Sequence, residues 1–231
     1  MFDLSRFTTH RRGFLGRLAA GAAAFGLGGL ATPVAAAARP TVTRDHVSAD
    51  PEFEAWLNRI TGKHKMMFDA TAPNQGFALA WARVFLNTTN DTYGTTDADN
   101  SVVIVVRHGA IPLAMESAMW AKYKFGEFFK VNDGATNAPA VRNPFARVKA
   151  GELFLPGMAV DELLAKGVQF GICNVALTVY SGMFAKSMGL QADAVKRDWV
   201  ANLLPGIQVV PSGVIAVNRT QEHGCAYCFA G

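Results

Sequence analysis

The sequence predicts an α/β protein, with a single three-layer domain whose mostly parallel sheet contains about five strands. The clearest observation is the continuous run Ser101–Val106, because a strand buried on both faces needs such a β-branched sequence, and these strands are typical of parallel sheets. The second observation is that apolar runs alternate with helical stretches from residue 63 onward. This alternation indicates a sheet with helices packed on its faces.

The individual elements follow from the hydrophobic pattern and from the helix-ending residues. Proline at position 112 favours a helix start, and Gly167 is typical of a helix end. Strands are expected at residues 63–70, 101–106, 167–173, 207–210 and 225–229. Helices are expected at residues 50–57, 73–86, 112–124, 158–166, 174–188, 193–203 and 213–222.

The pattern also predicts the connecting loops, the apolar face of one helix and the place of three tryptophans. Residues 87–100 are expected to form a polar loop, and the proline- and glycine-containing residues 126–156 a long insert or lid. The apolar face of the second helix is expected to consist of Phe77, Ala80, Trp81, Val84 and Phe85. Trp81, Trp120 and Trp199 are expected in the core.

The N-terminus is predicted to be an export signal. Arg11 and Arg12, followed by Gly13-Phe14-Leu15, match the twin-arginine pattern, and the Ala/Gly-rich stretch after them leads to cleavage sites near Ala38. We therefore expect a signal peptide at 1–38, a lead-in at 39–62 and the α/β domain at 63–231, with export to the periplasm. The alternative is a membrane anchor, but the stretch is shorter than the roughly 20 apolar residues of a span, and no later segment qualifies.

The charge of the chain argues against nucleic acid as a partner. The sequence has 22 basic and 18 acidic residues, but residues 1–38 hold four of the basic residues and one of the acidic ones. The remaining chain is therefore almost neutral, so its basic character belongs to the predicted signal and indicates no nucleic-acid surface.

Cys173 is the leading candidate for chemistry. It ends an apolar strand and is followed at once by a helical stretch that begins at Asn174. Ligands gather at the carboxyl ends of parallel strands, and the positive end of a helix favours a thiolate, which is the reactive form of cysteine. The alternative is a buried and inert thiol.

Neighbouring residues could share this crevice. His108 follows the Ser101–Val106 strand at the same edge, where it could accept a proton or bind an anion, although a turn histidine bonded to backbone is an equal alternative. Arg107 and Asn174 are candidates for anion binding. Asp69 ends the first strand, but one acid without a partner is weak evidence for acid–base catalysis.

The C-terminal Cys225-Ala226-Tyr227-Cys228 segment leaves several alternatives open. The pair could form a disulfide, stay as free thiols, or bind zinc or copper together with His223. In an extended strand the two cysteine side chains point to opposite faces, which disfavours a direct bridge between them. Cys173 could also pair with one of the two.

Three segments resemble the DsrE/DsrF-like sulfur-relay family. They are His108–Pro112 after its strand, Leu164–Asn174 with Gly167 and Cys173, and Leu203–Tyr227. The resemblance covers residues 98–227. It implies an α/β domain that assembles into trimers or hexamers, with the cysteine at position 173 carrying sulfur as a persulfide. The export signal and the terminal cysteine pair depart from the better-known members.

These observations lead to two main functional hypotheses, beside a third possibility of a homo-oligomeric scaffold for a sulfur or redox complex. The first is an exported protein that binds or relays sulfur through Cys173, with His108 beside it and a sulfur-donor or redox protein as partner. The second is a non-catalytic periplasmic protein that uses Cys225 and Cys228 for metal binding or as a structural bridge. The only cofactor expected is the zinc or copper ion that Cys225 and Cys228 could bind. After cleavage of the signal, no stable membrane anchor is expected.

Overall fold

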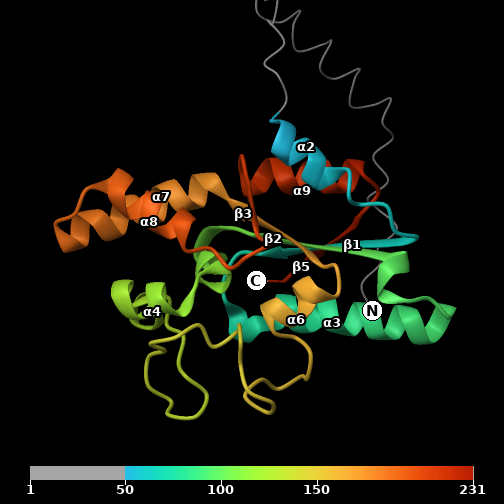
Figure 1. Cartoon of the computed structure of the whole chain (residues 1–231), viewed down its shortest axis with the longest axis horizontal. Helices are drawn as coiled ribbons and strands as arrows, with labels where there is room; N and C mark the ends of the chain where they lie inside the picture. Colours follow the sequence, from blue (N-terminus) through green and yellow to red (C-terminus); the bar gives the residue numbers. More distant parts are fainter. Residues whose placement is uncertain (1–49, 231) are drawn as a thin grey trace, which may run out of the picture. The chain divides into compact units, whose positions relative to one another are not determined.

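The computed structural model describes residues 50–230, so the predicted signal peptide lies outside the described residues. This part of the chain folds as one α/β unit in which helices pack on both faces of a five-stranded sheet (Figure 1). The predicted fold class is therefore confirmed. The strands are β1 (His64–Ala70), β2 (Asn100–Val106), β3 (Gln169–Cys173), β4 (Gln208–Val210) and β5 (Ala226–Phe229).

All strand pairs are parallel, and the strands lie in the order β4-β3-β2-β1-β5. β2 is buried along its whole length, as its β-branched sequence predicts. In the register of the sheet, Met66 of β1 lies between Val102 of β2 and Ala226 of β5. Because all the strands run in the same direction, their carboxyl ends meet at one edge.

One face of the sheet is covered by α2 (Pro51–Leu57) and α9 (Gly213–Glu222), which lie above it in Figure 1. Trp56 of α2 is fully buried and packs directly on β3. A β-carbon at Gly171 would lie 3.0 Å from the ring of Trp56, so glycine leaves the space that the indole occupies.

The other face is covered by α3 (Phe77–Tyr93) and α6 (Val160–Ala165), with further cover from shorter elements. These shorter elements are the 3-10 helix η3 (His108–Ala114), α4 (Ser117–Tyr123) and α5 (Phe125–Phe128). A pair of packed helices, α7 (Asn174–Met188) and α8 (Ala192–Ala201), extends beside the sheet. No helix among residues 50–230 combines the length and apolar character needed to cross a bilayer.

The expected loop at residues 87–100 is wrong in its first half, because α3 continues to Tyr93 and ends at Gly94, which has φ of 64°. The polar residues there form the last turns of the helix. Asn90 joins this end to β2, since its Oδ1 accepts from Nδ2 of Asn100 at 2.8 Å and its own Nδ2 donates to Asp97 at 2.7 Å. The helix therefore continues until Gly94, whose left-handed conformation ends it.

The expected helix at 112–124 is also wrong, because it is divided into η3 and α4. The backbone at Met115 is extended and forms an isolated bridge with Leu203. The N–H of Leu204 donates to the carbonyl of Ala114 at 2.8 Å and so occupies an acceptor that a continuous helix would use.

The buried face of α3 matches the predicted one only in part: Ala80 is buried and Phe85 packs against the core, as expected. Trp81 is 38 % exposed and Val84 is 43 % exposed, whereas Leu79, Ala82 and Leu86 are buried against the sheet. The prediction that Trp81 lies in the core is therefore wrong. Trp120 and Trp199 are fully buried, as predicted.

The predicted insert is confirmed as a long irregular segment between α5 and α6, and a buried amide anchors it. Nδ2 of Asn143 donates to the carbonyls of Leu113 at 3.1 Å and Met115 at 2.8 Å, and its Oδ1 accepts from the N–H of Phe145 at 2.9 Å. Asn143 is only 1 % exposed. Because these bonds satisfy the amide, the insert is held against η3.

Candidate functional site at the carboxyl edge of the sheet

Four chemically active side chains meet at the carboxyl edge of the sheet. Asp69 comes from the end of β1, Arg107 follows β2, Cys173 ends β3, and Tyr227 lies in β5. The parallel register produces this grouping. Asp69 lies opposite Val105 of β2, which is two residues before Arg107, and opposite Phe229 of β5, which is two residues after Tyr227. The N–H of Arg107 continues the ladder by donating to the carbonyl of Ala70 at 2.9 Å.

Asp69 and Arg107 form a bidentate ion pair. Nε of Arg107 donates to Oδ1 of Asp69 at 2.6 Å, and Nη2 donates to Oδ2 at 2.7 Å. The carboxylate is 1 % exposed and the guanidinium side chain 20 % exposed. The hydrogen bond with Asp69 raises the pKa of Arg107 above its ordinary value, so the arginine stays charged at all physiological pH values.

Tyr227 completes the hydrogen bonding of the buried carboxylate. Its hydroxyl donates to Oδ2 of Asp69 at 3.0 Å. Partial desolvation, together with this bond and the charge of Asp69, raises the pKa of Tyr227. Asp69 therefore accepts three hydrogen bonds from two side chains, which is how a buried charge is accommodated.

The first residue of α9 fixes the position of the arginine. A β-carbon at Gly213 would lie 2.7 Å from Cβ and 2.8 Å from Cδ of Arg107, so the aliphatic part of Arg107 packs directly on the helix backbone. With Asp69 holding Nε and Nη2, the third guanidinium nitrogen, Nη1, is left for another partner.

Cys173 occupies the N-cap position of α7. Its Sγ accepts a hydrogen bond from the N–H of Ala176 at 3.2 Å, and the residue is 6 % exposed. α7 has 15 residues, so its positive end supports negative charge on the sulfur. Cys173 also lies near enough to Arg107 for the two side chains to interact electrostatically.

His108 and Asn174 are placed at the same edge but are less tightly held. His108 is exposed and has φ of 47°, a left-handed conformation that is uncommon outside glycine. Asn174 is half-buried as the first residue of α7, and its carbonyl accepts from Oγ1 of Thr178 at 2.9 Å. Within residues 50–230 the side chain of neither residue makes a hydrogen bond.

The structure does not bring the two terminal cysteines, Cys225 and Cys228, close to each other. Cys225 is buried on the face under α2 and α9, while Cys228 packs against the core of the opposite face. Burial raises the pKa of the Cys225 thiol to about 11. All three cysteines, including Cys173, are free, and the described residues contain no group of three His, Cys, Asp or Glu side chains arranged to hold a metal ion.

The sequence pattern identified Cys173 and Arg107 but undervalued Asp69 and did not single out Tyr227. The signal available for Asp69 was an acid near the end of a predicted strand, with an arginine in the equivalent place after the next strand. Tyr227 gave no such signal, since it lies 158 residues from Asp69 in the chain. Only the pairing of β5 beside β1 brings it to the site.

Comparisons with known proteins add little to this geometry. No protein-family model matches the chain. No curated protein matches it either. Among solved structures, the chain is similar to MTH1491, a protein of unknown function from Methanobacterium thermoautotrophicum, with 17 % sequence identity and a TM-score of 0.39. That match covers 72 % of this chain and 99 % of the other.

Proposed function

We propose that this protein binds and relays sulfur through a persulfide on Cys173, as members of the DsrE/DsrF-like family do. The observation that supports the proposal best is the position of Sγ, which accepts the N–H of Ala176 at the start of α7 and lies near the charge of Arg107. A helix N-terminus and a nearby cation are the features that stabilise a reactive thiolate. The resemblance over residues 98–227 supports the same reading.

The proposed chemistry is a sulfane-sulfur transfer. The thiolate of Cys173 attacks the terminal sulfur of a donor persulfide, a new S–S bond forms on Cys173, and the donor's S–S bond breaks. The donor leaves as a thiolate that keeps the electron pair, so the reaction needs no external oxidant or reductant. Arg107 would offset the negative charge of the resulting perthiolate through Nη1, while Asp69 holds its other two nitrogens.

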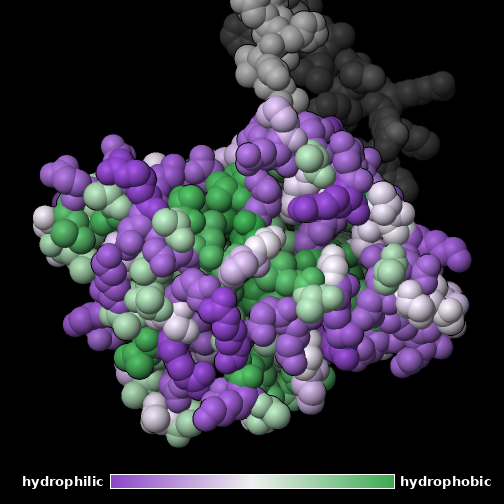
Figure 2. Space-filling view, viewed as in Figure 1, coloured by the Kyte–Doolittle hydropathy of each residue, from purple (hydrophilic) through white to green (hydrophobic). Residues whose placement is uncertain are grey.

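A surface next to the site suits docking of a donor or acceptor protein. Val175 and Val179 on α7 are each 53 % exposed, and Val214 on α9 is 71 % exposed. α7 and α9 contact each other, and Figure 2 shows apolar residues gathered in the region of α7. Exposed apolar residues that are grouped in this way are typical of protein interaction sites. Periplasmic export and a trimeric or hexameric state belong to the same proposal.

The experiment that tests the proposal is intact-mass spectrometry after incubation with a low-molecular-weight persulfide under anaerobic conditions. The wild-type protein should gain one sulfur atom, and the gain should map to Cys173. Cys173→Ser should lose this gain. Cys228→Ser is the matched control, because Cys228 is more exposed than Cys173 and lies outside the site, and it should load normally. Loading that persists in Cys173→Ser would contradict the proposal.

The alternative function, metal binding or a structural bridge at the terminal cysteines, receives no support from the geometry. Cys225, which precedes β5, and Cys228 within β5 pack on opposite faces of the sheet, so one ion cannot bind both thiols while the strand keeps its pairing with β1.

A further inference from the structure

A cavity of about 590 Å³ lies between the loop that follows β1 and the irregular insert. Its volume falls within the range of small-molecule sites, which is roughly 300 to 1,000 Å³. The lining includes Ala72–Gln75 on one side and residues of 129–154 on the other. Asp69, Arg107 and Cys173 are not part of the lining, so the cavity is separate from the proposed sulfur site.

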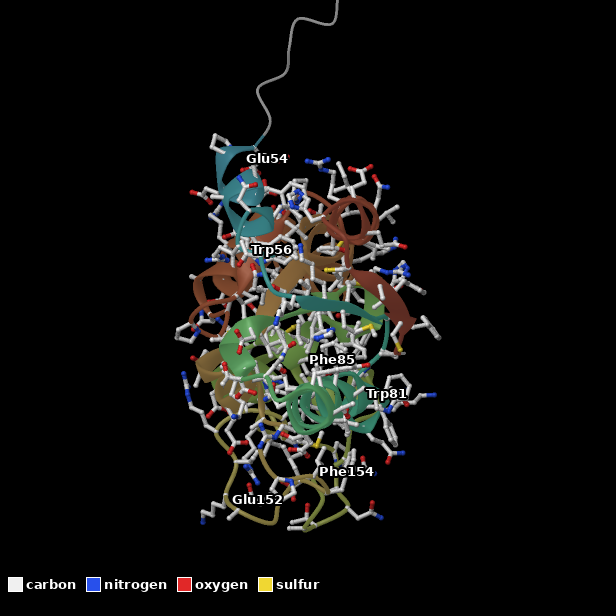
Figure 3. All side chains as sticks on the ribbon, turned by 90° about the vertical axis from the view of Figure 1, so that its right-hand side faces the viewer. Glu54, Trp56, Trp81, Phe85, Glu152 and Phe154 are labelled. Carbon is white, nitrogen blue, oxygen red and sulfur yellow. The ribbon has the colours of Figure 1, made fainter. Side chains whose placement is uncertain are left out.

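Aromatic rings form one side of this cavity and continue along the adjacent surface. Phe129 and Phe145 line the cavity, and Phe154 stands at its rim with 60 % of its surface exposed. The ring of Phe154 lies 5.4 Å from the ring of Phe77, which lies 5.9 Å from that of Trp81. Figure 3 shows Phe154 on the insert and Trp81 on α3, both on the lower side of the molecule. The row presents flat apolar surfaces to solvent.

Carboxamide groups supply most of the polar lining. Asn74 and Gln75 come from the loop after β1, and Asn132 and Asn137 come from the insert. Nδ2 of Asn132 donates to Oδ1 of Asn137 at 3.3 Å, which links two of these groups. Each carboxamide has two N–H donors and one oxygen acceptor, so the groups that stay unbonded can still hydrogen-bond to several hydroxyls.

The charges at the cavity disfavour an anionic ligand. The lining contains the carboxylates of Asp133 and Glu152 and no lysine or arginine. Backbone N–H groups lower the pKa of both carboxyls, so both are ionised at neutral pH. Arg142, which adjoins the cavity, pairs with Asp133 at 3.5 Å and with Glu152 at 3.0 Å. This pairing offsets much of the negative charge, so a ligand needs no positive charge of its own.

The rim residues are held in place before any ligand arrives. Asn74 and Gln75 have φ of 39° and 52°. These are left-handed backbone conformations, which residues other than glycine adopt with strain. Nδ2 of Asn74 donates to the carbonyl of Ala230 at 3.4 Å, and Asn143 anchors the insert opposite. Strained backbone that the surrounding structure maintains is often found where ligands bind.

We infer that this cavity binds a neutral, hydroxyl-rich ring compound of the sugar class. The C–H face of such a ring would pack on Phe154, and its hydroxyls would bond to the carboxamides. A planar cation would contact the aromatic rings and the carboxylates, but it offers no acceptor to the carboxamide N–H groups that remain unbonded. An anion would meet the two carboxylates.

The test is saturation-transfer NMR on the full chain with glucose, galactose and N-acetylglucosamine, each at millimolar concentration. Benzamidine and benzoate serve as a planar cation and a planar anion for comparison. At least one sugar should receive saturation, and Phe154→Ala or Asn132→Ala should weaken its binding about tenfold, as loss of an aromatic contact or a hydrogen bond predicts. Both side chains are exposed, so these variants should keep the fold.

Tyr93→Ala is the matched control, because Tyr93 is an exposed aromatic residue at the opposite end of α3, with 64 % of its surface accessible. It should bind the sugar as the wild type does. The inference would be overturned if none of the sugars received saturation, if benzamidine or benzoate bound in preference to them, or if Phe154→Ala left sugar binding unchanged. Because Cys173 is intact in these variants, sulfur loading can be measured on the same samples, and failure of one proposal is distinguishable from failure of the other.

Discussion

Replacing Arg107 by methionine should destabilise the protein strongly, because it leaves the carboxylate of Asp69 without its charge partner. Asp69 is 1 % exposed and would keep only the bond from the hydroxyl of Tyr227. Breaking a buried ion pair from one side costs about 3 to 5 kcal/mol. Methionine preserves much of the aliphatic contact with Gly213, so the loss reports on the charge rather than on packing.

The reverse change, Asp69→Asn, should cost less. Arg107 is 20 % exposed and can recover some solvation, and asparagine can still accept from one of the donors. A cost of about 1 to 3 kcal/mol is expected for donors left partly unsatisfied. The double variant should be more stable than the sum of the two single changes predicts, by about 1.5 to 3 kcal/mol, because neither buried charge then remains.

Urea unfolding of the wild type, both single variants and the double variant gives this coupling energy directly. Tyr227→Phe removes one hydrogen bond to Oδ2 of Asp69 and provides a smaller change of about 0.5 to 1 kcal/mol on the same scale. A coupling energy below about 0.5 kcal/mol would refute the reasoning, since it would mean that the two charges act independently.

Three further outcomes are expected. Burial raises the pKa of Cys225 from an ordinary 9.0 to about 11. Its neutral thiol therefore contributes stability that is complete below pH 9 and is lost as the pH rises through 11. Between pH 9 and 11 the free energy of unfolding should fall by about 2 kcal/mol more in the wild type than in Cys225→Ala. Gly126→Ala should lower the free energy of unfolding in urea by about 1 to 3 kcal/mol or more, because a β-carbon there would collide with the backbone of Ala140. The control Gly182→Ala lies in open space within α7 and should be neutral or stabilising by about 0.5 kcal/mol. Asn143→Leu should expose the insert to limited proteolysis, since it removes three buried hydrogen bonds; an insert that resists protease as the wild type does would show that other contacts hold it.

Sequence patterns located most elements where the local signal is strong. The β-branched run of β2 strongly favours a buried strand, and α7 begins after Cys173 and ends at Gly189, with φ of 67°, as its pattern predicts. Such elements are specified by residues close together in the chain. The end of α6 before Gly167, which has φ of 85°, is likewise specified by neighbouring residues.

The buried face of α3 could not be predicted in this way. Apolar residues occur nearly all around this helix, so two different faces satisfy the helical period. The sheet selects Leu79, Ala82 and Leu86, and Trp81 and Val84 remain at the surface. The choice depends on the shape of the surface to which the helix docks, and that shape is not encoded within the helix.

The sequence by itself determined the α/β class, the number of strands and the place of Cys173 at the junction of a strand and a helix, because these depend on hydrophobic period and neighbouring residues. Only the tertiary structure decided that Asp69, Arg107 and Tyr227 form one hydrogen-bonded group, since Asp69 lies 38 residues from Arg107 and 158 from Tyr227. Side chains so far apart in the chain meet only when strand order and register are fixed. That order depends on the burial of the whole sheet, which no local pattern contains.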